Sequence, residues 1–127
     1  MVLKLILLAA AGALGTLSRY GLGVLVEKWA GGPFPWGVFI VNMLGCLLFG
    51  LIFEFTKSRA DWGPDVQFIV LTGFMGAFTT FSTYAFQTGV FLRESQWGLA
   101  MANIAAQNVV GIACVFAGVA LGRVVAG

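Results

Sequence analysis

The chain has 127 residues, of which 60% are hydrophobic and only 9% carry a charge, and its mean hydropathy is +0.97. Soluble domains carry about 25% charged residues, so this composition excludes an ordinary soluble protein and predicts a membrane protein. The net charge of +2 is too small to indicate nucleic acid binding, and the absence of histidine removes the commonest general base and metal ligand at neutral pH.

Charged residues divide the chain into four apolar stretches, joined by short connections that contain glycine, proline or charged residues. Each stretch is long enough for a membrane-spanning helix, which needs about 20 residues. No second domain is indicated, so residues 1–127 are predicted to form one all-α integral membrane domain. We expect its four transmembrane helices at about 3–26, 35–56, 66–92 and 97–124.

The first stretch begins like a secretory signal, with a lysine, an apolar run and small residues. Its apolar character resumes after Arg19, so we expect the segment to be kept as a helix. Arg19 is the only charge well inside a span, where burial costs about 2.5–3.5 kcal/mol. It either attracts an anion into a water-filled vestibule or snorkels to the membrane interface, and the residue type supports both interpretations equally.

Amide side chains are the strongly polar residues of the second and fourth stretches. Asn42 offers two donors and an acceptor, and its residue type favours a hydrogen bond between helices over a donor for a permeating anion. Asn103 and Gln107 are four residues apart and therefore share a helix face. Because amides are costly in lipid, we expect this face to contact protein or water.

The third stretch contains TGFMGAFTTFSTYAFQT, residues 72–88, which is rich in glycine and hydroxyl side chains. Glycine weakens a helix and hydroxyl side chains compete for backbone hydrogen bonds, so a break is predicted near 73–80. Such a break must be buried by protein or reached by water, and its free carbonyl groups can coordinate a cation. Two inverted copies on a two-fold axis would bring their breaks together around the ion.

Phe81 and Tyr84 follow the predicted break and share a helix face because they are three residues apart. The edge of an aromatic ring is electropositive, so it can stabilise a passing anion without a fixed counter-charge. Spacing alone nevertheless favours ordinary packing for both rings.

The positive charges indicate only a weak preference for one orientation in the membrane. A chain with so little bias can insert in both directions, and inverted copies can then pair. The charges support equally a single topology with both termini inside the cell. The side of the termini carries Lys4, Lys57, Arg59 and Arg123, and the opposite side carries Lys28 and Arg93.

Three strings of the sequence resemble the Fluc (CrcB-type) fluoride channels: GALGTLSRYGLG at 12–23, VNMLGCLLFG at 41–50 and TGFMGAFTTFSTYAF at 72–86. The resemblance covers the whole chain, and its third string is the most specific. It implies an antiparallel, dual-topology homodimer with two separate pores in the bacterial inner membrane. Its function would be passive, fluoride-selective export from the cytoplasm, which protects the cell from fluoride toxicity.

The resemblance also implies roles for individual residues by position. A structural sodium ion (Na+) at the dimer centre would be held by the backbone carbonyls of Gly76 and Thr79, and Arg19 would stand in the vestibule. The fluoride pore would be lined by Asn42, Phe81, Ser82, Thr83, Tyr84, Asn103 and Gln107.

Four residues depart from the pattern of the family. Tyr84 stands where phenylalanine is expected, and Gln87 where glutamate is frequent. Asn103 and Gln107 stand where tyrosine and serine or threonine are expected. These departures concern the polar track of the pore and leave the expected fold unchanged.

Three alternatives to the channel come from other classes of protein. A small proton-coupled multidrug exporter of the four-helix type has the same size, but it needs an acid within the membrane, where this chain has Arg19. A non-conducting structural subunit would use the glycines and amides for packing only. An enzyme is not expected, since no nucleophile can be paired with a base without histidine or embedded acids.

Overall fold

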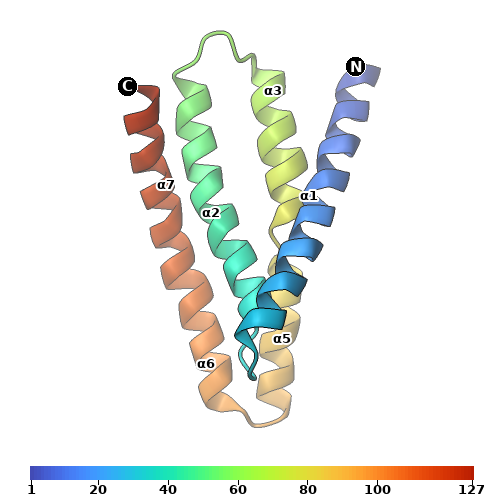
Figure 1. Ribbon diagram of the computed structural model, residues 1–127, viewed down its shortest axis with the longest axis vertical. Coiled ribbons are helices and arrows are strands. Elements are labelled where there is room, and N and C mark those ends of the chain that lie inside the picture. Colours follow the sequence, from blue (N-terminus) through green and yellow to red (C-terminus); the bar gives the residue numbers. More distant parts are fainter.

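The computed structural model describes residues 1–127 and contains helices and connections but no strands. Four helical rods run along one another, with both termini at the same end of the molecule (Figure 1). All four are long and apolar enough to cross a membrane, as predicted. The rods are α1 (Val2–Ala30), α2 (Trp36–Lys57), a third rod of α3 (Pro64–Phe68), π-helical η1 (Ile69–Met75), α4 (Gly76–Phe78) and α5 (Phe81–Arg93), and a fourth of α6 (Trp97–Ala105), π-helical η2 (Ala106–Val110) and α7 (Gly111–Ala126).

The connection between α1 and α2 begins with two glycines in the left-handed region. Gly31 has φ +61° and Gly32 has φ +84°, conformations that residues with a Cβ rarely adopt. The next helix begins at Trp36, where Glu27 Oε1 accepts a hydrogen bond from the backbone N–H of Gly37 at 2.7 Å. A carboxylate is favourable at this position because the first N–H groups of a helix have no partner within it.

Glycines bring α2 and α7 into close contact along their length. A Cβ at Gly118 would clash with the Leu47 carbonyl, and a Cβ at Gly50 with the Val115 carbonyl. In the same way Gly15 of α1 lies against the Phe74 carbonyl of η1. Small residues let membrane helices approach closely, and these glycines serve that purpose here.

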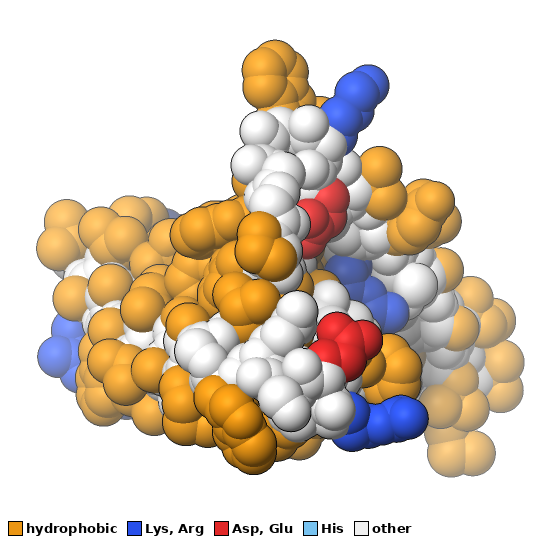
Figure 2. All heavy atoms as spheres, turned by 90° about the horizontal axis from the view of Figure 1, so that it is seen from below, with side chains coloured by type: hydrophobic (Ala, Val, Ile, Leu, Met, Phe, Trp, Pro, Cys, Tyr) orange, Lys and Arg blue, Asp and Glu red, His pale blue; other side chains and the backbone are white.

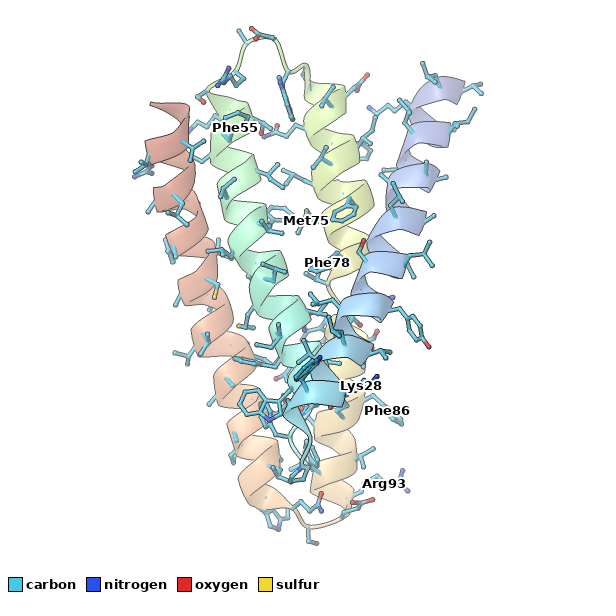
Figure 3. The ribbon with its side chains drawn as sticks, viewed as in Figure 1. Lys28, Phe55, Met75, Phe78, Phe86 and Arg93 are labelled. Carbon is cyan, nitrogen blue, oxygen red and sulfur yellow. The ribbon has the colours of Figure 1, made fainter.

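The buried core is small for a chain of this length, with 21 of 127 residues buried. Its apolar cluster is Val41, Leu71, Met75 and Phe78, and Figure 3 shows Met75 and Phe78 between α2 and the third rod. Most large hydrophobic side chains instead lie on the outside, where Phe86 is 72% exposed. This surface requires lipid or another protein to cover it.

The third rod is interrupted at Thr79 and Thr80, which have extended backbones with ψ 159° and 109°. The interruption lies at the C-terminal end of the predicted range 73–80. Gly73 and Gly76 are both helical, so the threonines and not the glycines mark the break. Above it α1 packs against η1 and α4, whereas below it α5 packs against α6.

Candidate functional site

Asn42 of α2 binds both backbone groups of Thr80 at the interruption. The Thr80 N–H donates to Asn42 Oδ1 at 2.8 Å, and Asn42 Nδ2 donates to the Thr80 carbonyl at 3.1 Å. Both residues are buried, so these bonds replace partners that water would otherwise supply. The favoured interpretation of Asn42 from its residue type, a hydrogen bond between helices, is confirmed.

The hydroxyl of Thr80 starts the helix that follows the interruption. Its Oγ1 accepts a hydrogen bond from the Thr83 backbone N–H at 3.2 Å and lies 2.9 Å from Thr83 Oγ1, the geometry of an N-cap. Before the interruption, the N–H of Thr79 donates to the Met75 carbonyl at 3.1 Å. Because the Thr80 N–H bonds to Asn42, it is not available to the Gly76 carbonyl as it would be in a continuous helix.

A cavity of about 270 Å³, which we call the amide cavity, lies beside Asn42 between α2, the interruption and the fourth rod. Asn42 Nδ2 also donates to Gln107 Oε1 at 3.0 Å, which fixes Gln107 in the cavity wall. Its apolar wall includes Phe49 and Cys46. Four of the predicted pore residues meet in this wall, namely Asn42, Phe81, Tyr84 and Gln107.

Two of the aromatic rings of α5, Phe81 and Tyr84, line the amide cavity. Phe81 and Tyr84 have ring centroids 5.4 Å apart and planes at 69°, so the edge of one ring points toward the other. Tyr84 is buried, whereas Phe81 is 77% exposed. Asn108, which sequence reasoning did not place at the site, donates through Nδ2 to the Tyr84 hydroxyl at 3.2 Å. No sequence signal could have found this contact, because it joins two rods.

The other predicted pore residues lie outside the amide cavity. Asn103 is fully buried and donates through Nδ2 to Thr88 Oγ1 at 3.0 Å. Ser82 is exposed, and its hydroxyl lies 3.4 Å from Thr80 Oγ1. Thr83 faces a second and larger cavity.

This second cavity, which we call the vestibule, has a volume of about 630 Å³ and lies between α1, the start of α2 and α5. Arg19 lines it, and Nη1 of Arg19 approaches the Thr79 carbonyl at 3.4 Å. Glu27 and Gln87 also line it. Thr80 is the one residue that borders both cavities, so the Asn42–Thr80 pair lies between them.

Acidic and basic side chains lie close together on one side of the end face that carries the 31–35 and 94–96 connections, and the opposite side is mainly hydrophobic, with basic side chains at its edge (Figure 2). The two charged side chains of the vestibule are Arg19 and Glu27. The amide cavity has no charged side chain in its wall.

No group of three or more His, Cys, Asp or Glu side chains could hold a metal ion. The oxygen atoms available for a cation are backbone carbonyls near the interruption. The Gly76 carbonyl has lost the bond that Thr80 would supply in a continuous helix, and Gly76 is exposed. The Thr79 carbonyl has only the long contact with Arg19, so both neutral oxygens suit a hard monovalent cation.

Comparison with known proteins found a family model and several relatives that match nearly the whole chain. The family model described as "CrcB-like protein, Camphor Resistance (CrcB)" matches residues 6–119. A protein of Nitrosococcus oceani named "Fluoride-specific ion channel FluC" is 51% identical over 122 residues, covering 96% of this chain and 98% of that protein. Proteins of the same name are 47% identical over 125 residues in Solidesulfovibrio magneticus (98% and 100% covered) and 49% over 123 in Nitratidesulfovibrio vulgaris (96% and 98% covered).

Proposed function

The chain belongs to the CrcB-like family of multi-pass membrane proteins, and on this premise we propose that it is a fluoride-selective channel of the bacterial inner membrane. The observation that carries the proposal is the interrupted third rod, where Asn42 and Thr80 lie between a vestibule that contains Arg19 and a neutral cavity lined by amides and aromatic rings. Relatives that span the same length are named fluoride-specific ion channels.

In this proposal the vestibule attracts the anion, and the amide cavity binds it weakly enough to release it. Arg19 in the vestibule raises the local concentration of anions by its charge. The amide cavity offers neutral donors and the positive edges of Phe81 and Tyr84. Neutral groups replace the hydration shell of fluoride without a fixed charge that would hold the ion and slow its exit.

Passive conduction is sufficient for fluoride export. Neutral hydrogen fluoride enters a cell from an acidic exterior, ionises in the cytoplasm and is trapped there as the anion. A channel lets this anion leave down its gradient without an energy source. We therefore assign the protein a role in protecting the cell from fluoride toxicity.

We further propose that two copies pair in opposite directions and form two separate pores. Phe81 is 77% exposed and Phe86 is 72% exposed on the same rod, so α5 presents large rings that a partner can cover. The weak charge bias between the two ends allows insertion in both directions. A second copy placed head to tail would bring the two interruptions together.

We propose in addition that a sodium ion lies at the centre of this pair, held by the backbone carbonyl oxygens of Gly76 and Thr79. Two such oxygens from each copy would surround the ion with neutral ligands, and the ion would tie the two copies together. Arg19 Nη1 lies 3.4 Å from the Thr79 carbonyl, so the guanidinium group would have to move away from this oxygen when the ion is bound.

Efflux from liposomes tests the proposed function. The purified protein is reconstituted in liposomes loaded with fluoride or chloride, and the released ion is followed with an ion-selective electrode. We expect fluoride efflux and no comparable chloride efflux. An exporter of cationic drugs would instead need a free embedded acid, and the one acid in the vestibule, Glu27, is engaged with the start of α2.

A further inference from the structure

Hydrogen bonds to the backbone determine which atoms of the cavity amides are nitrogen. Asn42 contacts both the N–H and the carbonyl of Thr80, so its Oδ1 must accept and its Nδ2 must donate. The Gln107 atom that lies 3.0 Å from Asn42 Nδ2 must then be the oxygen. This assignment fixes the orientation of the Gln107 amide group. Its Oε1 accepts from Asn42 Nδ2, and its Nε2 makes no contact with Asn42.

Both hydrogens of Asn42 Nδ2 are therefore engaged, one by Thr80 and one by Gln107. Gln107 Nε2, in contrast, is buried and donates to no group of the chain. Two other buried side-chain atoms lack a partner, on Gln87 and Asn103, but both are oxygens that would repel an anion. The wall of the amide cavity thus contains one buried donor without an acceptor, which is costly unless a ligand supplies it.

The same reasoning leaves the hydroxyl hydrogen of Tyr84 free. Asn108 Nδ2 donates to the Ile104 carbonyl at 2.8 Å and to the Tyr84 hydroxyl at 3.2 Å. Because the Ile104 carbonyl can only accept, this Asn108 atom is the nitrogen, and the Tyr84 oxygen accepts from it. The phenolic hydrogen can then point to another acceptor, and Tyr84 lines the same cavity as Gln107.

We propose that Gln107 Nε2 and the Tyr84 hydroxyl are the donors that bind the anion in the amide cavity, and that Asn42 is a positioning residue. Asn42 holds Thr80 and turns the Gln107 nitrogen away from itself. This inference rests on the proposed function and names the donors of that site. Tyr84 and Gln107 are two of the residues that depart from the family pattern. In this chain the phenol of Tyr84 and the carboxamide of Gln107 would replace water molecules around the ion.

Conservative variants in liposomes test the assignment. Fluoride efflux is measured over a range of fluoride concentrations for Tyr84→Phe and Gln107→Met, which keep the size of the side chains. Loss of a donor to an anion raises the half-saturating fluoride concentration about tenfold or more. The matched control is Gln67→Met in α3, where Gln67 Nε2 donates to Thr56 Oγ1 at 2.9 Å, and we expect its half-saturation to equal that of the wild type.

A binding measurement in detergent gives a second readout. We expect fluoride to raise the melting temperature of the wild type more than chloride does, because an ion that binds the folded state stabilises it. This increase is smaller in Tyr84→Phe and Gln107→Met. If Gln107→Met does not fold, Tyr84→Phe decides alone, because it removes one hydroxyl and leaves the ring in place.

The outcomes separate this inference from the function on which it rests. Absence of fluoride efflux from the wild type overturns both. Wild-type efflux together with unchanged half-saturation in a folded Tyr84→Phe, or in a folded Gln107→Met, overturns the donor assignment and leaves the channel intact.

Discussion

Asn42 shows how one side chain stabilises a local structure that the backbone cannot sustain alone. An extended Thr80 within the membrane would leave a buried N–H and a buried carbonyl, at a cost of about 1–3 kcal/mol each. A carboxamide can satisfy both groups, because it donates and accepts in one plane. The hydrogen bond between helices was predictable from residue type, but its partner was not, because Thr80 lies 38 residues away.

Asn42→Ala is expected to lower stability as well as fluoride efflux. Removing the amide leaves two Thr80 backbone groups without partners, so the free energy of unfolding falls by about 2 kcal/mol or more. The melting temperature in detergent measures the change. Gln67→Ala is the control, since it removes a single side-chain hydrogen bond; a smaller drop in Asn42→Ala than in this control would contradict the role of the amide.

Cys46 allows a chemical test of whether ions reach the amide cavity. Cys46 lines this cavity, whereas Cys114 does not, although both thiols are free. Silver ions bind thiolates strongly, so we expect Ag+ to stop fluoride efflux in the wild type and in Cys114→Ser. Cys46→Ser should conduct in the presence of Ag+. Equal block of the two serine variants would show that the thiol of Cys46 is not in the ion path.

The elements differ in how far the sequence could predict them. The four spans follow from charge spacing. The interruption was predicted from the glycines and hydroxyl residues of 72–88, and of these only Thr79 and Thr80 leave the helical conformation. The π-helical segments η1 and η2 had no such signal, because they depend on packing between rods and not on local preference. For the same reason Asn103 was expected in the pore but bonds to Thr88 away from the amide cavity.

Contact between α2 and α7 should tolerate no added methyl group at Gly118. A Cβ there clashes with the Leu47 carbonyl, so Gly118→Ala must separate the two helices and should cost about 1–3 kcal/mol. Gly98→Ala is the matched control, because a Cβ at Gly98 meets nothing within 4 Å. Thermal unfolding in detergent compares the two variants, and equal melting temperatures would contradict the close packing.

At the scale of the whole molecule, the exposed hydrophobic surface must be covered by lipid or by a second copy of the chain. The weak charge bias determines in which direction each copy inserts. The sequence predicts that four spans place the termini on one side, and the structure agrees (Figure 1). The direction of insertion depends on the membrane and its translocation machinery. Antiparallel pairing therefore stays a prediction that rests on the charges and on the exposed rings of α5.

Changing the charge bias should alter assembly without touching either cavity. Lys28→Gln with Arg93→Gln leaves positive charge mainly at the end of the termini, so all copies should insert with the termini inside. We expect this variant to lose dimers and fluoride efflux when expressed alone. Co-expression with the opposite variant, in which Lys4, Lys57, Arg59 and Arg123 are all replaced by glutamine so that only Lys28 and Arg93 remain at the two ends, should restore both. Full efflux from the first variant alone would exclude a need for inverted copies.

The interruption also divides the third rod mechanically. Its upper half is packed against α1 and its lower half against α6, and no helical hydrogen bond at Thr80 continues from one half to the other, since that N–H belongs to Asn42. The third rod therefore consists of two helical segments joined by a hinge at Thr80, which the Asn42 carboxamide holds in place. Hydrogen–deuterium exchange should show that the two segments open independently. In Asn42→Ala, the Thr80 amide should be the first to lose its protection.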